Sequence, residues 1–361
     1  MRRWWMAAAA ALLIGNTALA QDKVVKIYNW SDYIDPSILT DFTAKTGIKV
    51  VYDVYDSNDI LETKLLAGNT GYDLVVPTNS YLARQIQAGI FQELDKSKIP
   101  NLKNLDPDLM AKAAQFDPDN AHAIIYMWGT TGVAYNVDKI KQRMPDAPVD
   151  SWSLVFDPEV AKNFADCGIM MLDSSEDVLP SVLRWLGEDP LSKDPKVIQK
   201  AADALEKVRP YIRKFHSSEN INALANGDIC ISLMFSGDAG IARTRAEEAK
   251  NGVDIEYFIP KEGAMLWFDM MAMPNDAPDP ENAYAFIDYI LQPEVIAKAS
   301  NFVTYPNAVP DSFQYIEDDV KGDPSLFPPP DLRAKLFVNT PYDQRTQRAV
   351  TRMWTKIVTG G

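Results

Sequence analysis

The stretch Ile27–Ile34, IYNWSDYI, decides the fold class. It overlaps the end of the apolar, β-branched run Val24–Tyr28 and continues into the polar residues that follow. This pattern predicts a short buried strand that ends in a loop. Helix-like and strand-like segments then alternate with short links, which predicts an α/β protein with a parallel, doubly wound sheet. Loops at the carboxyl ends of such strands hold ligands, and the two rings and the carboxylate of Trp30–Tyr33 suit an organic cation. Alternatively, the rings are core residues and Asp32 caps the next helix.

The N-terminus has the pattern of a secretory signal peptide over residues 1–20. Arg2 and Arg3 precede an apolar run that is too short to span a membrane, and Ala18–Ala20 fits the small-residue cleavage rule. Nothing later approaches about 18 uninterrupted apolar residues. We therefore expect export to the periplasm and a soluble mature chain.

The length, hydrophobic content and net charge of the chain limit what it can bind. The chain has 361 residues, of which 47% are hydrophobic, and its formal net charge is −14. This length is enough for two lobes of ordinary domain size. The negative charge argues against nucleic acid, whose binders concentrate positive charge, and gives weak support to a cationic ligand.

The two cysteines, Cys167 and Cys230, suggest a disulfide, because an even pair in an exported protein is most simply bonded. Each lies beside a strand-like run, 168–172 or 228–235. A bond between them would close a loop of about 60 residues and contribute about 4 kcal/mol in the chain-entropy model. The alternative is two unpaired buried thiols.

Catalytic and metal-binding motifs are missing from the sequence. There are only two histidines, and there is no HExxH, GxSxG, P-loop or GxGxxG pattern. The sequence therefore predicts a binding protein without a metal or cofactor, and not an enzyme.

One acid stands out because its surroundings are apolar. Asp269 is the single charge in the strand-like run Met265–Met273, and burying it unpaired would cost several kcal/mol. A fold tolerates such a group when a cation binds to it. Asp238 is ambiguous, because it could equally cap a helix that opens at Ala239.

Several runs, taken in order, resemble one family: the polyamine-binding periplasmic proteins of bacterial ABC importers, and in particular their putrescine-binding branch. The similar runs are IYNWSDYI (27–34), GIKVVYDVYDSN (47–58), YMWGTTGVAYNVDK (126–139), FHSSENINALANGDIC (215–230) and PKEGAMLWFDMMAMP (260–274). The resemblance covers nearly the whole chain after the signal peptide.

The resemblance implies a two-lobed clamshell of the type II solute-binding class, in which each lobe is a sheet flanked by helices. Lobe 1 would comprise residues 21–133 and 262–315, and lobe 2 residues 134–261 and 316–361. A hinge is expected near Val133–Tyr135, with a second crossing near 259–263. The protein would bind a polyamine as a monomer and deliver it to the membrane permease of an ABC importer.

The resemblance also implies a ligand site. Ser31, Asp32 and Asp177 would hold one ammonium group, and Asp238 and Asp269 the other. The methylene chain would lie against the rings of Trp30, Tyr33, Phe235, Trp267 and Tyr305. Thr78 and Ser217 match polar pocket positions, and the disulfide of the family falls on Cys167 and Cys230.

Four positions depart from the putrescine-binding pattern: Phe235, Trp267, Asp177 and Asn339. Asp177 is shorter than the usual glutamate, with Glu176 beside it as a possible substitute, and the polar Asn339 could meet an additional amine. A receptor for spermidine, agmatine or another cationic amine therefore stays open, as does a polyamine-sensing subunit. A secreted hydrolase or amine-processing enzyme on the same fold is a further alternative, against which the missing nucleophile and base argue.

Overall fold

The computed structural model describes residues 23–324 and 326–360. The signal peptide predicted at residues 1–20 lies outside the described residues. Among the helices that are described, none has the length and apolar composition needed to cross a membrane.

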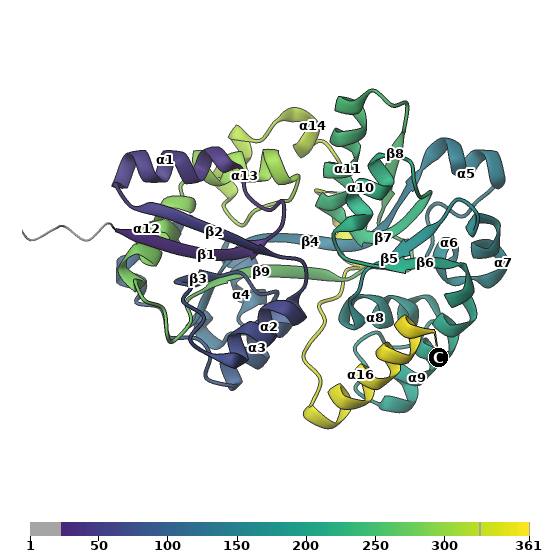
Figure 1. Ribbon diagram of the computed structural model, residues 1–361, viewed down its shortest axis with the longest axis horizontal. Coiled ribbons are helices and arrows are strands. Elements are labelled where there is room, and N and C mark those ends of the chain that lie inside the picture. Colours follow the sequence, from purple (N-terminus) through teal and green to yellow (C-terminus); the bar gives the residue numbers. More distant parts are fainter. Residues whose placement is uncertain (1–22, 325, 361) are drawn as a thin grey trace, which may run out of the picture.

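The described strands join into one sheet that runs through the whole molecule (Figure 1). The strand order is β2-β1-β3-β9-β4-β7-β5-β6, and β8 also pairs with β4. Their bounds are β1 (Val24–Trp30), β2 (Lys49–Tyr55), β3 (Leu74–Val75), β4 (Ala123–Asn136), β5 (Ile169–Met171), β6 (Ile212–Phe215), β7 (Ile231–Phe235), β8 (Ile255–Phe258) and β9 (Leu266–Ala272).

The sheet is mixed, whereas the sequence predicted a parallel one. β1 is parallel to β2 and β3, and β5 is parallel to β6 and β7, but β9 runs antiparallel to both β3 and β4. The chain leaves the first half of the molecule along β4 and returns beside it along β9. Neighbouring outgoing and returning strands are necessarily antiparallel, and this pairing is not visible in local sequence.

β4 is the strand that joins the two halves. Its residues from Ala123 to Thr130 pair with β9, and those from Thr131 onward pair with β7 and β8. Every residue of this 14-residue strand is buried. The change of partner lies between Thr130 and Thr131, earlier in the chain than the hinge expected near Val133–Tyr135.

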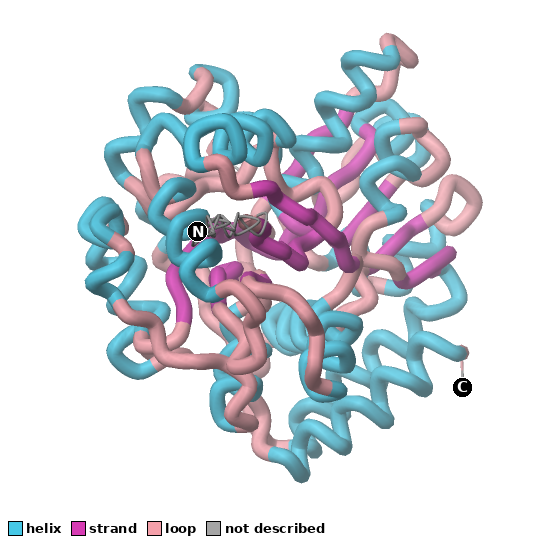
Figure 2. Tube along the Cα trace, turned by 60° about the vertical axis from the view of Figure 1, so that its left-hand side comes forward, coloured by secondary structure: helices cyan, strands magenta, loops and turns pink. Residues whose placement is uncertain are grey.

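Helices cover both faces of each half of the sheet (Figures 1 and 2). They are α1 (Pro36–Thr46), α2 (Asn58–Ala67), α3 (Asn79–Gln87), α4 (Pro107–Ala113), α5 (Val137–Arg143), α6 (Ser153–Phe156), α7 (Pro158–Ala161), α8 (Ser175–Trp185), α9 (Pro195–Val208), α10 (Glu219–Ala225), α11 (Ser236–Ala249), α12 (Pro280–Ile290), α13 (Pro293–Val303), α14 (Asp318–Lys321), α15 (Pro330–Arg333) and α16 (Gln344–Thr359). In Figure 1, α1 and α13 lie above the first half and α2 and α3 below it. In the second half α10 and α11 lie above, and α8, α9 and α16 below.

α1 shows how local sequence sets these elements. The Asp35 carboxylate accepts a hydrogen bond from the Ser37 amide, and Pro36 occupies the first turn, where its missing N–H costs nothing. Gly47 ends the helix in the left-handed region, at φ 73°. The helix from Pro36 to Thr46 is the one predicted from the sequence.

Each half has its own hydrophobic core. The first is built from residues between Val25 and Trp128 and between Met265 and Val309. The second is built from residues between Val133 and Ala264, together with Val350 and Ile357 of α16. The two-lobed α/β fold predicted from the sequence is therefore confirmed.

The predicted disulfide is present. Cys167 and Cys230 are bonded, with their Cα atoms 5.6 Å apart and a sequence separation of 63. Cys230 directly precedes β7, and Cys167 lies two residues before β5; the two strands pair in parallel with Ile169 opposite Ile231. The bond thus ties two neighbouring strands of the second half.

We predict that the double variant Cys167→Ala/Cys230→Ala loses about 4 kcal/mol of unfolding free energy, because the unfolded chain regains the entropy of a long loop. Urea unfolding of the oxidised wild type and the double variant measures the difference. Reductant should lower the stability of the wild type toward that of the variant and leave the variant unchanged. Equal stability of the oxidised wild type and the variant would contradict the prediction.

Candidate functional site

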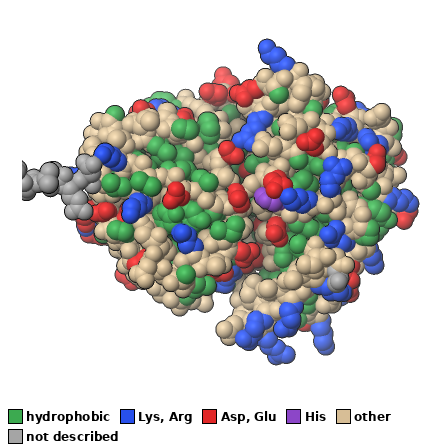
Figure 3. Space-filling view, in the orientation of Figure 1, with side chains coloured by type: hydrophobic (Ala, Val, Ile, Leu, Met, Phe, Trp, Pro, Cys, Tyr) green, Lys and Arg blue, Asp and Glu red, His purple; other side chains and the backbone are tan. Residues whose placement is uncertain are grey.

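A pocket lies where the two halves meet, and it contains most of the residues predicted from the sequence. Its empty volume, including its opening, is about 520 Å³. The predicted residues that line it are Trp30, Ser31, Tyr33, Thr78, Asp177, Ser217, Phe235, Asp238, Trp267, Asp269 and Tyr305. Figure 3 shows acidic side chains along the groove between the halves on this face.

The pocket residues come from strand ends and helix starts of both halves. Trp30 ends β1, and Thr78 immediately precedes α3. Asp177 and Asp238 lie in the first turns of α8 and α11, where the helix dipole favours negative charge. Asp269 lies within β9. No single segment builds the site, and both cores are needed to hold it together.

Asp269 is a buried carboxylate held by hydroxyl groups. Its side chain is 4% exposed and accepts hydrogen bonds from Tyr33 Oη and Thr78 Oγ1, each at 2.7 Å. Thr78 is itself oriented by Asn58, whose Nδ2 donates to Oγ1 at 2.8 Å. Burial raises the pKa of Asp269 to about 7, against the two hydrogen bonds, which lower it.

Asp238 forms a contact across the two halves. The Tyr305 hydroxyl donates to Asp238 Oδ1 at 2.8 Å and accepts from the Asp238 amide at 3.1 Å. Burial is the main cause that raises the pKa of Asp238 to about 7, and the charges of Asp32 and Asp269 raise it further. The alternative role as a helix cap is not what the structure shows, because no side chain caps the start of α11.

Asp177 and its neighbour Glu176 have different surroundings. Asp177 is 7% exposed and accepts from Thr131 Oγ1 at 2.7 Å and Ser174 Oγ at 2.5 Å. Burial raises its pKa to about 6, and the charge of Glu176 contributes. Glu176 instead pairs with Arg84 and accepts from Ser80 Oγ at 2.6 Å. Only Asp177 of this pair lines the main pocket.

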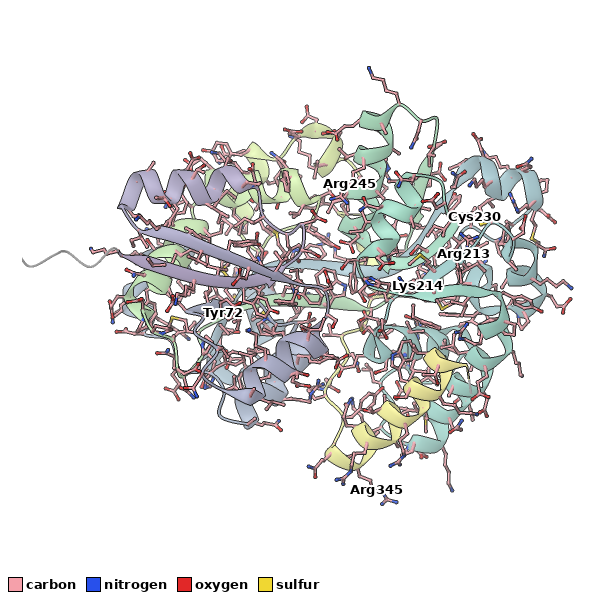
Figure 4. The ribbon with its side chains drawn as sticks, viewed as in Figure 1. Tyr72, Arg213, Lys214, Cys230, Arg245 and Arg345 are labelled. Atoms are coloured by element: carbon pink, nitrogen blue, oxygen red, sulfur yellow. A yellow bond between two sulfur atoms is a disulfide. The ribbon has the colours of Figure 1, made fainter. Side chains whose placement is uncertain are left out.

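Asp32, predicted to bind ligand, is not among the pocket-lining residues. Its carboxylate forms an ion pair with Arg245 Nη2 at 3.0 Å, and its side chain is 46% exposed. Its backbone is in the left-handed region, at φ 55°. The cap of α1 is Asp35, so Asp32 does not have the alternative capping role either. Arg245, labelled in Figure 4, lies on α11 near the junction of the halves.

Five aromatic rings form the apolar walls. The ring centroid of Trp267 lies 5.3 Å from that of Phe235 and 5.4 Å from that of Tyr305, and both contacts are edge to face. Tyr33 lies 5.4 Å from Tyr305, also edge to face. Trp30 is fixed by a hydrogen bond from its Nε1 to the Val76 carbonyl, at 3.0 Å. The rings provide apolar surface and, toward a cation, favourable ring faces.

Three lining residues were missed by the sequence analysis: Asn58, Ser218 and Ile221. Asn58 follows the polar end of β2, and this strand-end pattern could have identified it. Ser218 is adjacent to the predicted Ser217 and donates to Asp56 Oδ1 at 3.1 Å. Ile221 is one apolar residue of the short helix α10, and its sequence carries no signal of a pocket role.

The charge of the pocket is unbalanced. Among the described residues, no Lys or Arg forms an ion pair with Asp177, Asp238 or Asp269. The described acids, histidines and cysteines also form no group of three or more that could hold a metal ion. Separate carboxylates between aromatic walls suit an elongated organic cation better than a compact ion.

Comparison with known proteins gives the family. The sequence pattern of the bacterial extracellular solute-binding proteins matches residues 37–328. The chain belongs to this family. Its members bind and carry solutes, in agreement with the prediction of a binding protein and not an enzyme.

Similar proteins cover the whole chain. It is 49% identical to the putrescine-binding periplasmic protein SpuD of Pseudomonas aeruginosa, over 100% of both chains. It is also 49% identical to the putrescine-binding periplasmic protein PotF of Escherichia coli, over 99% of this chain and 98% of that one. The chain also resembles the solved structure of the spermidine/putrescine ABC transporter substrate-binding protein PotD from Streptococcus pneumoniae, with a TM-score of 0.75 and 30% identity. The match covers 94% of this chain and 99% of that one.

The raised pKa values predict how the stability of this solute-binding protein depends on pH. Between about pH 4 and 7 the native pocket acids retain protons that the unfolded chain has released, so their contribution to stability falls as pH rises. Asp269→Asn removes one of these groups. Relative to wild type, the ligand-free variant should become more stable by about 1 kcal/mol or more between pH 5 and 8.

Urea unfolding at several pH values, with ligand removed, measures this difference. Glu294→Gln is the matched control, since Glu294 is an exposed acid in the first turn of α13. A difference between wild type and Asp269→Asn that does not change with pH would contradict the prediction.

Proposed function

We propose that this protein is the periplasmic, solute-capturing subunit of a polyamine ABC importer, and that putrescine is its main ligand. The observation that carries the proposal is the set of buried pocket acids that form no ion pair with a Lys or Arg among the described residues. A diammonium with a short alkyl chain supplies the missing charges and fills the space between the rings. Relatives named for putrescine binding, at 49% identity, support the same ligand.

In this proposal the two ends of the ligand are held separately. Asp238 and Asp269 hold one ammonium group, while Asp177 and Ser31 hold the other. We assign Asp32 a role through its ion pair with Arg245, because it stands outside the pocket lining. A ligand of the wrong length would leave a buried charge unpaired, and this penalty supplies discrimination.

Closure of two lobes is part of the proposal. Ligand contacts from both lobes favour the closed state over the open one. We place three points at which the chain passes from one lobe to the other. The first lies within β4, the second just before β9, and the third near Phe337, which pairs with Met265. The segment after residue 315 packs Ile316 and Val320 against Ala297 of α13. We therefore assign it to lobe 1 and move the last boundary from 315 toward 337.

A longer polyamine such as spermidine is the second candidate, because of Asn339. This residue is buried, and its Nδ2 lies 3.3 Å from the Glu176 carbonyl, to which it donates. Its Oδ1 has no hydrogen-bond partner among the described residues. Asn339 lines a small cavity that shares Thr78, Asp177 and Trp267 with the main pocket. An additional amine could donate to this oxygen.

Calorimetry with a panel of amines tests the proposal. We expect putrescine to bind at least tenfold more tightly than 1-butylamine, which has one charge fewer on the same chain. Spermidine and agmatine distinguish the second candidate. If no polyamine binds at micromolar concentrations, the proposal is wrong. Loss of labelled putrescine uptake in cells lacking the protein would separate transport from sensing.

Removing either buried charge should weaken binding. We predict that Asp238→Asn and Asp269→Asn each cost more than about 1 kcal/mol of binding free energy for putrescine, because an ammonium would lose a charged acceptor. Titration calorimetry at pH 7.5 measures the effect, and Glu294→Gln serves as the exposed control. Wild-type affinity in both pocket variants would show that the ligand lies elsewhere.

A further inference from the structure

Trp267 differs from the other tryptophans of the described chain in the hydrogen bonding of its ring nitrogen. Each of the other five donates its Nε1–H to an oxygen; these residues are Trp30, Trp128, Trp152, Trp185 and Trp354. Nε1 of Trp267 is buried and has no partner among the described residues. Its side chain is only 4% exposed, so packing alone sets the direction of the ring.

Gly129 supplies the surface on which this ring rests. Gly129 and Trp267 are direct cross-strand partners in the β4–β9 pair, which run side by side in Figure 1. A Cβ atom on Gly129 would lie 2.6 Å from Cζ2 and 2.7 Å from Cη2 of Trp267. It would also lie 3.0 Å from Cε1 of Tyr305. The six-membered part of the indole therefore occupies the place of a side chain.

Backbone geometry does not require glycine at this position. Gly129 is absent from the residues with positive φ, and it lies in a regular strand, where any residue could adopt its backbone. The three atoms nearest to a side chain at this position all belong to two rings of the pocket wall, those of Trp267 and Tyr305. The absence of a side chain at position 129 thus serves the placement of those rings.

We propose that Gly129 is a positioning residue for ligand binding, which keeps the Trp267 indole against β4 and out of the space of the ligand. The inference rests on the proposed polyamine function and deepens it. With a methyl group at position 129 the ring must move away from β4. Trp267 lines the pocket, so an indole displaced toward the pocket takes up volume that the ligand needs.

This mechanism separates binding from folding. In the ligand-free protein the indole can turn into the empty pocket without breaking a hydrogen bond, since it makes none with the described residues. We therefore expect Gly129→Ala to shift the ligand-free Tm little and to weaken putrescine binding at least tenfold. A residue with a purely structural role would show the opposite: a large fall in Tm with unchanged affinity of the folded molecules.

The rescue variant is Gly129→Ala/Trp267→Phe. Phenylalanine lacks the two indole atoms, Cζ2 and Cη2, that the new methyl group would approach most closely. We expect the double variant to bind putrescine within about threefold of Trp267→Phe alone. If Gly129→Ala by itself does not fold, a folded double variant with this affinity supports the proposal, and an unfolded one overturns it.

Gly132→Ala is the matched control on the same strand. Its Cβ would lie 2.4 Å from Tyr257 Oη and 2.6 Å from the Phe258 carbonyl oxygen, and neither residue lines the pocket. This variant should lower the ligand-free Tm and leave the affinity of the folded fraction near that of wild type.

Calorimetry and thermal unfolding are compared for the wild type and four variants, and they test the role of Gly129. The variants are Gly129→Ala, Trp267→Phe, Gly129→Ala/Trp267→Phe and Gly132→Ala. Wild-type affinity in Gly129→Ala, or a loss that Trp267→Phe does not relieve, overturns the role of Gly129 while the proposed function stands. Absence of amine binding by the wild type itself overturns the proposed function and this inference together.

Discussion

The candidate site depends on the burial of three carboxylates for which the described chain provides hydroxyl partners but no ion-paired Lys or Arg. Hydroxyls of Tyr33, Thr78 and Tyr305 orient two of them without neutralising their charge. Burial raises their pKa values to about 6 to 7, so near neutral pH protons and a cationic ligand compete for them. The burial that makes these acids unfavourable in the free protein strengthens their attraction for a cation in the pocket.

The same constraint explains why the site lies between two cores and not within one. Asp269 and its hydroxyl partners belong to the first half, whereas Asp238 and Asp177 begin helices of the second. A pocket inside one lobe would bury the acids permanently. At the junction, hydrogen bonds such as those of Tyr305 with Asp238 and of Ser218 with Asp56 join the two halves. The acids of the two halves therefore face one shared space at the junction.

Sequence predicted this site wherever the signal was local. The lone acid in the apolar run around Asp269 was expected to be buried, and it is. Trp30 and Phe235, which end two strands and which the resemblance placed in the pocket wall, both line the pocket. Asp32 fits its motif as well as its neighbours do, yet its left-handed backbone goes with a carboxylate that faces Arg245. The strand-like run at Met265–Met273 is β9, but its antiparallel direction was missed, because strand pairing depends on contacts far apart in the chain.

Glu176 and Asp177 show what decides whether an acid is available to a ligand. They are adjacent in the first turn of one helix, and successive residues there point about 100° apart. Glu176 meets Arg84, so its charge is already balanced. Asp177 meets only the hydroxyls of Thr131 and Ser174. Of the two acids, only Asp177 lines the main pocket and forms no ion pair with a described Lys or Arg, which is why we assign the ligand role to it and not to Glu176.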